Sequence, residues 1–256
     1  MVLSIITITF NNFSELKGTL DSIPKLEFIE SVVVNGGDCP QTKEFLKSYK
    51  GKSISEKDNG IADAFNKGIK LASGDLLMFL NSGDILIDPS YLVNAREQFL
   101  INKKIDFVHS NLVLKDASRT DLFMRPTFSH LGRGMPYLHP TMIVRKKIFD
   151  SVGMFNLNYK IAMDFDFIVR LKKKELSGYY VKEGFPIAMD GSGKSITKEG
   201  KAIRECFTIL KENKELNIQN LLGYFQRYIL FGGRKFLAFS GQSDLLLKIK
   251  ARKHSR

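Results

Sequence analysis

The sequence contains only two cysteines and no long hydrophobic run. Cys39 and Cys206 lie far apart, which indicates a reducing compartment and no disulfide framework. No stretch approaches the roughly 18 consecutive apolar residues that a membrane-spanning helix needs. The first ten residues, MVLSIITITF, lack the basic segment of a signal peptide and predict a strand instead. We therefore expect a cytoplasmic protein whose 256 residues, 43% of them hydrophobic, bury a full core.

Positive charge is concentrated at the end of the chain. The net charge is +12 at pH 7, and residues 201–256 contain 12 Lys and Arg against 4 Asp and Glu, which is +8. Such a segment is either a solvated basic tail or a surface for anionic lipid at the inner face of a membrane. Aromatic and aliphatic residues interleave with the basic ones in 221–239, which favours a membrane over nucleic acid as the partner. We divide the chain into a domain at 1–215 and a basic amphipathic extension at 216–256.

Short apolar runs alternate with helical patterns in the first 84 residues. Strands are predicted at 3–9, 31–34, 53–55 and 76–80, and helices at 13–23, 41–50 and 61–72. This alternation predicts an α/β fold with a mostly parallel sheet flanked by helices. Farther along we predict helices at 89–102, 146–151, 162–174 and 197–214, strands at 105–114, 141–144, 178–182 and 186–189, a loop over the site at 116–136, and a loosely attached helical end.

The stretch from residue 55 to residue 84 indicates where a site lies. Small and apolar residues recur on one helical face from Ile61 to Ala72, with Asn59 as the predicted N-cap. The run from Leu76 to Leu80 is continuously apolar, which is typical of a strand buried on both faces. Asn81-Ser82-Gly83-Asp84 follows at the carboxyl end of that strand, where open α/β sheets bind their ligands.

Six short motifs follow one another along the chain. They are SIITITFNN (4–12), VVVNGGD (32–38), EKDNGIADAFNKGI (56–69), GDLLMFLNSGD (74–84), HPTMIVRKKIFDSVGMFN (139–156) and AMDFDFIVRL (162–171). In this order and spacing, the chain from Leu3 to about Leu210 resembles glycosyltransferase family 2. The resemblance implies the GT-A fold and an inverting glycosyltransferase, and it is nearest to the bacterial enzymes that build surface polysaccharides.

The resemblance assigns donor binding to polar residues near the strand ends and on the central helix. The predicted set is Thr9, Asn11, Asn35, Asp58, Asn66, Lys67 and Asn81. Asn35 stands where the family usually has an aspartate, and asparagine keeps an acceptor while it adds a donor. Each residue has a structural alternative, since short polar side chains cap helices, carboxylates favour helix starts, and Asn66 and Lys67 also suit a solvated helix face. We interpret Asn12 as a helix cap.

The resemblance places Asn81-Ser82-Gly83-Asp84 at the DXD motif of the family. A divalent cation there, Mn²⁺ or Mg²⁺, bridges the two phosphates of a nucleotide sugar and takes carboxylate ligands. Asn81 and Gly83 replace the first and third residues of the motif, so Asp84 is its one anionic ligand. His139 is a candidate second ligand, with a structural role as the alternative.

Asp164 matches the catalytic base of the family. An acceptor hydroxyl loses its proton as it attacks, and a positioned carboxylate takes that proton. Asp164 lies where a helix is predicted to start, which favours its charged form, and Asp166 is interpreted as support. The alternative is that both are ordinary acids of a first helical turn.

The resemblance implies transfer of a hexose-type sugar from a nucleoside diphosphate, a UDP-sugar, to a glycan or a lipid-linked saccharide. Two other classes stay open. A nucleotidyltransferase needs a glycine-rich, lysine-bearing start after the first strand, and TFNNFSEL offers none. A catalytically impaired nucleotide-binding protein is supported by the departures at Asn81 and Gly83.

Overall fold

The structure is a computed structural model, and it describes residues 1–115, 121–127, 130–191 and 197–240. The strands are β1 (Leu3–Thr9), β2 (Ile29–Asn35), β3 (Lys52–Ser55), β4 (Leu76–Phe79), β5 (Ile85–Leu86), β6 (Phe107–His109), β7 (Leu112–Lys115), β8 (Asp121–Met124), β9 (Ile143–Arg145), β10 (Gly178–Tyr180) and β11 (Ile187–Asp190). The helices are α1 (Phe13–Ser22), α2 (Pro40–Lys47), α3 (Ile61–Leu71), α4 (Ser90–Ile101), α5 (Ile148–Val152), α6 (Met163–Lys173), α8 (Glu199–Glu212) and α9 (Ile218–Phe239), with short 3-10 turns η1 (Leu131–Arg133) and η2 (His139–Thr141).

Seven strands form the central sheet in the order β10-β6-β9-β4-β1-β2-β3. β1 pairs in parallel with β2 and β4, β2 pairs in parallel with β3, and β6 pairs in parallel with β10. β9 runs antiparallel between β4 and β6. The predicted α/β fold with a mostly parallel sheet is confirmed.

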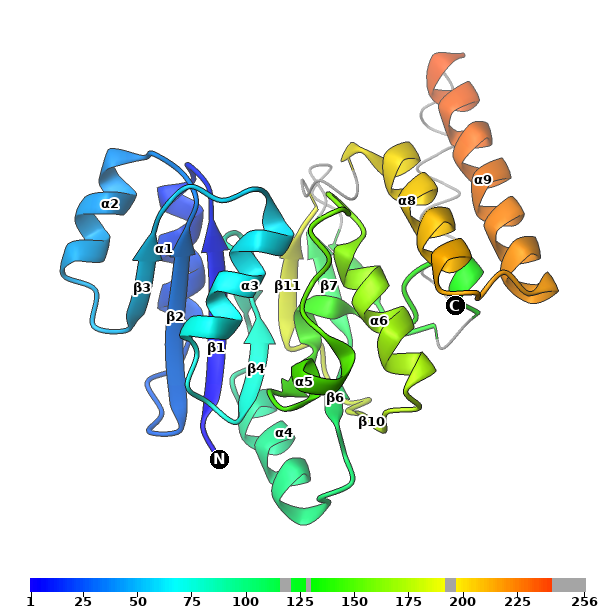
Figure 1. Cartoon of the computed structure of the whole chain (residues 1–256). Helices are drawn as coiled ribbons and strands as arrows, with labels where there is room; N and C mark the ends of the chain where they lie inside the picture. Colours follow the sequence, from blue (N-terminus) through cyan, green and yellow to red (C-terminus); the bar gives the residue numbers. More distant parts are fainter. Residues whose placement is uncertain (116–120, 128–129, 192–196, 241–256) are drawn as a thin grey trace.

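Helices cover both faces of the central sheet (Figure 1). Successive residues of a strand point to opposite faces. Ile6 and Leu77 therefore belong to the core cluster that contains residues of α3 and α6, whereas Ile5 and Met78 belong to the one that contains residues of α4. Burial on both faces explains why the sequence of β4 is continuously apolar instead of alternating.

Helix α3 forms where the periodicity predicts it, and its small residues set how closely it approaches the sheet. A Cβ atom at Gly68 would lie 2.4 Å from Ile6 Cγ2, so glycine is required for this contact. The N-cap is Gly60 at a φ of 121°, so the prediction of Asn59 as the cap is wrong. Asn59 instead donates its backbone N–H to Asp63 Oδ2 at 2.9 Å.

A second sheet, in the order β5-β11-β7-β8, lies beside the central one. The prediction of a single strand at 105–114 is wrong, because the chain leaves the central sheet after β6 and joins the second sheet at β7. Ser110 and Asn111 lie between them, where Ser110 Oγ donates to Val181 O at 2.8 Å and Asn111 Nδ2 donates to Lys182 O at 2.8 Å. These contacts come from a distant segment, and the local sequence has no glycine or proline to mark the break.

Helix α9 packs beside α8 and against η1 (Figure 1). Asn220 of α9 is buried, and its Oδ1 accepts the backbone N–H of Gly132 at 3.0 Å. The expectation of a loosely attached C-terminal part is therefore wrong for the start of α9, and residues 241–256 lie outside the described residues. The predicted loop at 116–136 holds β8 and η1, with residues 116–120 and 128–129 outside the described part. Within the described part of the chain, no helix has the length and apolar character to cross a membrane.

Candidate active site

Polar residues from neighbouring strands meet at one edge of the central sheet. Thr9 ends β1 and Asn35 ends β2, and the two are partners in the register. Asn81 lies just beyond β4, where the next backbone N–H, of Ser82, donates to Ile8 O at 3.1 Å. The amino-terminal ends of α3 and α6 lie at the same edge, uppermost in Figure 1. The parallel topology thus gathers the predicted strand-end residues in one place.

Asn11 and Asn35 hold the loop that follows β2. Asn11 adopts a left-handed conformation with a φ of 55°, and its Oδ1 accepts the backbone N–H groups of residues 38 and 39 at 2.8 and 3.0 Å. Asn35 is fully buried, and its side chain bonds to both backbone groups of Gly37 and to the Ser55 hydroxyl. Both amides therefore fix the shape of this loop, and their contact with a nucleotide stays a prediction.

Asp58 lies over Gly36 in the same loop. A Cβ atom at Gly36 would lie 1.6 Å from Asp58 Oδ2, so the close approach requires glycine. The other carboxylate oxygen, Oδ1, accepts the backbone N–H of Gly60 at 2.9 Å. The carboxylate is therefore held between the end of β2 and the start of α3.

Thr9 and Asn12 bond to each other. Thr9 Oγ1 donates to Asn12 Oδ1 at 2.7 Å, and the backbone N–H of Phe10 donates to the same oxygen at 3.1 Å. Asn12 occupies the N-cap position of α1, but its side chain makes no capping hydrogen bond. The predicted capping role is wrong, because the turn after β1 already uses that oxygen.

On α3, Asn66 and Lys67 make contacts with other segments of the protein. Asn66 Oδ1 accepts the backbone N–H of Phe155 and its Nδ2 donates to Phe155 O, both at 2.9 Å. Lys67 Nζ lies 2.9 Å from a Glu56 oxygen and 3.5 Å from an Asp63 oxygen. Burial alone would lower the pKa of Lys67, but these two carboxylates raise it above its ordinary value. Asn66 thus fixes the segment that leads to α6, and the donor-binding role of both residues stays a prediction.

Asp84 is a buried carboxylate in the turn between β4 and β5. Its Oδ1 accepts the backbone N–H of Asp190 at 3.2 Å, and its Oδ2 accepts that of Asn81 at 3.3 Å. Burial raises the pKa of Asp84 to about 7, and the negative charge of Asp190 adds to the effect. In the same turn, Asn81 Oδ1 and Ser82 Oγ are buried without a hydrogen-bond partner among the described residues. Two carboxylates and an unused amide oxygen suit a hard divalent cation.

His139 lies in the aromatic core. Its ring stacks on Phe79 with centroids 5.5 Å apart and contacts Phe65 and Phe155. Burial lowers its pKa to about 4. No group of three or more His, Cys, Asp or Glu side chains suited to a metal ion occurs in the parts of the chain that the structure describes. We therefore favour the structural alternative for His139 and replace it by Asp190 as the second candidate ligand.

Asp164 lies in the first turn of α6, as predicted. Its side chain is half-buried, and its Oδ1 accepts the backbone N–H of Phe165 at 2.8 Å. Burial raises the pKa of Asp164 to about 6, backbone N–H groups oppose this, and the charge of Glu205 supports it. Lys160 Nζ donates to Asn59 O at 3.3 Å, so the segment before α6 lies against the start of α3. Asp164 is thus ionised at neutral pH and still basic enough to accept a proton.

Sequence reasoning missed Asp190 and Glu205. Asp190 ends β11, so the rule that ligands bind at strand ends would have found it had the end of the predicted strand at 186–189 been treated as a site. Glu205 lies in the middle of α8, and no pattern in its own segment marks it. Only the packing of α8 against α6 brings it near Asp164.

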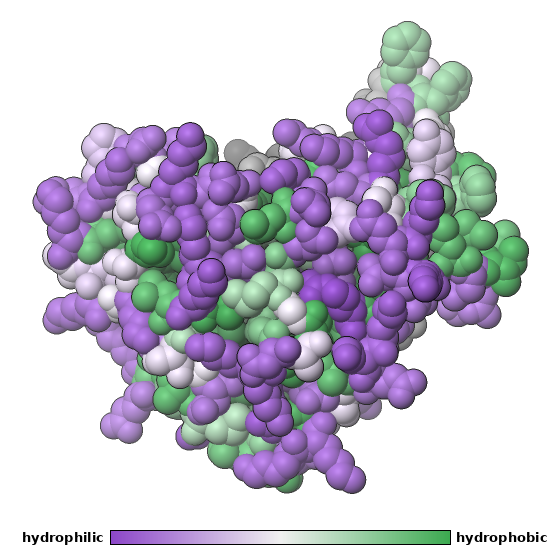
Figure 2. Space-filling view, viewed as in Figure 1, coloured by the Kyte–Doolittle hydropathy of each residue, from purple (hydrophilic) through white to green (hydrophobic). Residues whose placement is uncertain are grey.

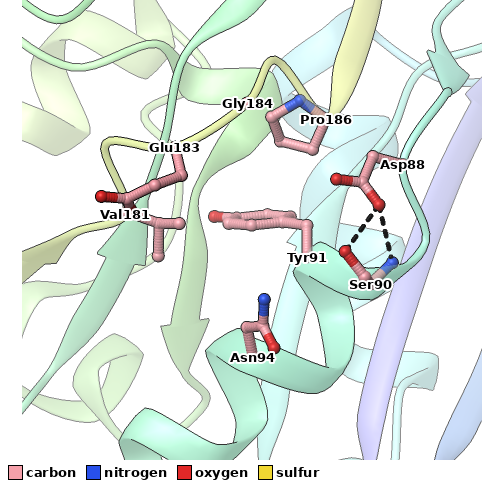
Figure 3. Close-up of a pocket in the computed structure, with 8 residues that line it drawn as sticks. All are labelled: Asp88, Ser90, Tyr91, Asn94, Val181, Glu183, Gly184 and Pro186. Atoms are coloured by element: carbon pink, nitrogen blue, oxygen red, sulfur yellow. Dashed lines mark hydrogen bonds between the residues drawn. The ribbon is translucent and has the colours of Figure 1, made fainter.

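Two cavities lie elsewhere in the described structure. One of about 270 Å³ is lined by residues of α4 and of the segment before β11, with the Tyr91 ring near its centre (Figure 3). Asp88 Oδ1, on its wall, accepts from the backbone N–H and the hydroxyl of Ser90. The other, of about 560 Å³, lies near the amino end of β4 and includes Asp75 and Arg145. Neither is lined by the predicted site residues, and we place the site at the strand ends because the carboxylates with raised pKa values lie there.

The chain is similar to known proteins in sequence. A family model described as Glycosyl transferase family 2 matches residues 4–153. A PGL/p-HBAD biosynthesis glycosyltransferase from Mycobacterium bovis (strain BCG / Pasteur 1173P2) is 27% identical over 179 residues, which cover 65% of this chain and 68% of the relative.

Solved structures show the same fold. The crystal structure of S. aureus TarS 1–349 in complex with UDP-GlcNAc has a TM-score of 0.64 and 19% identity, and covers 82% of this chain and 66% of that one. The mannosyltransferase PcManGT from Pyrobaculum calidifontis, in complex with GDP-Man and Mn²⁺, has a TM-score of 0.62 and 14% identity. The match covers 99% of this chain and 83% of the PcManGT chain. At these identities the likeness extends to the fold alone.

Proposed function

Because this chain belongs to glycosyl transferase family 2, we propose that it transfers a hexose-type sugar from a UDP-sugar to a glycan or lipid-linked saccharide, with inversion at the anomeric carbon. The observation that carries this proposal is that the ends of β1 and β2, the turn after β4 that contains Asp84, and the start of α6 that carries Asp164 lie at one edge of the sheet. TarS is solved with UDP-GlcNAc, which supports uridine as the nucleotide. The M. bovis relative, a biosynthesis glycosyltransferase by its name, supports a role in polysaccharide or glycolipid synthesis.

The donor nucleotide, in this proposal, lies on the loops after β1 and β2. Asn11 and Asp58 flank the loop after β2, and their side chains are at least partly exposed. Thr9 and Asn35 contribute by fixing the turns from which backbone groups reach the base or ribose. Lys67 connects α3 to Glu56 in the segment after β3, and Asn66 connects α3 to the backbone of Phe155.

Asp84 and Asp190 would hold a divalent cation, Mn²⁺ or Mg²⁺, with Asn81 Oδ1 as a neutral ligand. These residues fit the ion because the buried Asp84 carboxylate lies 3.2 Å from the backbone nitrogen of Asp190, at the end of β11, and the buried Asn81 Oδ1 has no partner among the described residues. Neutralising the charge on the leaving diphosphate is the chemistry that the bound cation supplies. PcManGT, which has a similar fold, is solved in complex with GDP-Man and Mn²⁺, which supports a divalent cation as the cofactor.

Asp164 would act as the general base in a single displacement. The acceptor oxygen forms a bond to the anomeric carbon while the bond from that carbon to the diphosphate oxygen breaks. The hydroxyl proton passes to Asp164, and the nucleoside diphosphate leaves with the electron pair. One displacement inverts the anomeric centre, and base catalysis of this kind contributes about 10²- to 10⁴-fold.

The extension that begins at residue 216 would place the enzyme at the inner face of a membrane. Hydrophobic side chains project along α9 (Figure 2), and several of them are well exposed. Basic residues follow them in the sequence. A lipid-linked acceptor is presented at such a surface, which is why we prefer it to a freely diffusing saccharide.

A thermal-shift screen of UDP, GDP and their sugars, with and without Mn²⁺, tests the proposal. A ligand that binds only the folded state stabilises it by about 2.7 kcal/mol at 100 times its Kd. We expect one nucleotide to raise the melting temperature, and Mn²⁺ to enlarge the shift. Asp84→Asn should abolish the metal-dependent part, while Asp21→Asn, on the exposed face of α1, should not.

Transfer is then measured as release of the nucleoside diphosphate in the presence of saccharide acceptors. No shift with any nucleotide, in a protein that unfolds cooperatively, would contradict the proposal. Binding without turnover under any condition would instead favour the catalytically impaired nucleotide-binding protein that the Asn81 and Gly83 departures suggest.

A further inference from the structure

The N-cap residue of α6 is Ala162, whose side chain cannot accept a hydrogen bond from the backbone N–H groups of the helix start. The residues before it, Lys160 and Ile161, also expose successive backbone N–H groups that need a partner. Asp164 lies in the first turn of α6. A residue that accepts hydrogen bonds from the backbone N–H groups before this turn therefore also positions the Asp164 carboxylate.

Glu205 of α8 supplies that partner. Its Oε2 accepts the backbone N–H groups of Ile161 and Ala162, both at 2.9 Å, and its Oε1 accepts that of Lys160 at 3.3 Å. Its neighbours on the helix, Ala202 and Cys206, are buried, so the backbone of Glu205 is held in the core. A carboxylate also interacts favourably with the partial positive charge of a helix start.

The charge of Glu205 faces Asp164 as well. Cys206 on α8 also interacts electrostatically with Asp164, and its Sγ accepts a hydrogen bond from Arg227 Nη1 of α9 at 3.5 Å. Asp166 is the second acidic residue in the first turn of α6. Asp166 is paired with Arg170 at 2.8 Å, so its charge is compensated. Glu205 is thus a negative neighbour of Asp164 with no ion pair among the described residues.

We propose that Glu205 is a positioning residue for the base: it fixes the start of α6, and with it Asp164, and it keeps a negative charge beside that carboxylate. The inference rests on the proposed function, in which Asp164 accepts the proton of the acceptor. A negative neighbour disfavours ionisation of Asp164, so Glu205 makes the base stronger and requires a higher pH for it to be charged.

The test compares Glu205→Gln, Glu205→Ala and Glu199→Gln in the full chain. Glutamine keeps an oxygen acceptor for the backbone N–H groups but removes the charge. We expect Glu205→Gln to move the acidic limb of the pH profile of kcat to lower pH by about half a unit or more. Glu205→Ala, which also loses the cap, should lower kcat by about tenfold or more with the donor KM nearly unchanged. Glu199→Gln, at the first residue of α8, where Glu199 pairs with Arg234, should leave both the pH profile and kcat unchanged.

An NMR titration of the Asp164 side-chain carboxyl provides a readout without turnover. We expect its pKa to fall in Glu205→Gln and to stay unchanged in Glu199→Gln. If Glu205→Gln shifts neither the pH profile of kcat nor the pKa of Asp164 in the NMR titration, the inference is overturned even if the enzyme is active. If instead the wild type transfers no sugar, or Asp164→Asn transfers it normally, the proposed function fails, and the titration still decides whether Glu205 acts on Asp164.

Discussion

Asp164 and Asp166 lie two residues apart on α6, yet their surroundings differ. Asp166 is buried and paired with Arg170, whose guanidinium also donates to backbone carbonyls of residues 152–154. Asp164 has a backbone N–H and a negative neighbour, and its pKa is raised to about 6. When two nearby carboxylates differ in this way, the one with the raised pKa is the candidate for proton transfer. Asp166 and Arg170 anchor the segment around it.

The pH dependence of turnover follows from the raised pKa of Asp164. A base acts in its ionised form, and the ionised fraction of this carboxyl rises with pH through about 6. We expect kcat to rise over that range and then level, and Asp164→Asn to lower it by about 10²- to 10⁴-fold without loss of nucleotide binding. Nucleoside diphosphate release, measured from pH 5 to pH 8, checks both. A variant that keeps more than half of the wild-type rate would rule out Asp164 as the base.

At the scale of elements, Glu30 joins the edge of the central sheet. It lies in β2, and its Oε2 accepts hydrogen bonds from the Ser4 hydroxyl of β1 and from the backbone N–H of Ser73, just after α3. Its Oε1 accepts from the Ser73 hydroxyl and lies 2.9 Å from Lys52 Nζ of β3. Burial alone would raise the pKa of Glu30, but these partners outweigh burial and lower it to about 2. One carboxylate therefore connects three strands and a helix.

Glu30 should make folding stability depend on pH. Because its pKa in the folded state lies below the ordinary value of 4.5, it stabilises the fold above pH 4.5, and this contribution is lost as the pH falls toward 2. We expect Glu30→Gln to lower the free energy of unfolding at pH 7 by about 1–3 kcal/mol. Urea unfolding at pH 7 and near pH 3 measures the difference, which should shrink at the lower pH. An equal loss of unfolding free energy at pH 7 and near pH 3 would show that the charge of Glu30 does not stabilise the fold.

At the scale of the whole molecule, α9 has two different faces. Asn220 and Arg227 contact η1 and α8, and Tyr224 lies against Phe207 with ring centroids 4.7 Å apart. The outward face carries exposed apolar residues at helical spacing. Ile218, Leu222, Phe225, Ile229 and Phe236 are each between 58% and 70% exposed. An apolar face of this kind on a basic segment suits an anionic lipid surface.

Substitutions on the outward face of α9 test membrane contact without removing its packed side. Deletion of the whole helix would expose the core around Asn220, so the double variant Leu222→Ser with Ile229→Ser is the sharper change. We expect it to weaken sedimentation with anionic lipid vesicles by about tenfold and to leave thermal stability unchanged. Ile101→Ser, an equally exposed apolar site on α4, serves as the control. Equal vesicle binding by all three proteins would contradict membrane contact through α9.

The sequence predicted most of the elements that carry the site. β1 and α3 were found from periodicity and β4 from its continuous apolar run, and the strand-end rule predicted Thr9, Asn81 and Asp84 at one edge. Boundaries and caps were less reliable, as Gly60 in place of Asn59 shows, because a cap depends on backbone conformation at a single residue. The break between β6 and β7 was missed because its stabilising contacts come from residues 181 and 182.

The order of strands and helices along the chain, and the polar residues at the strand ends, were determined by the sequence itself, since alternating patterns and polar turns act within a few residues. Only the tertiary structure decided that His139 stacks in the core, that Asp190 meets Asp84, and that Glu205 caps the helix of Asp164. Each of these depends on segments that are distant in the chain and become neighbours only when the core packs. Local sequence patterns do not predict such contacts, because the contacts are stabilised only when the whole core has packed.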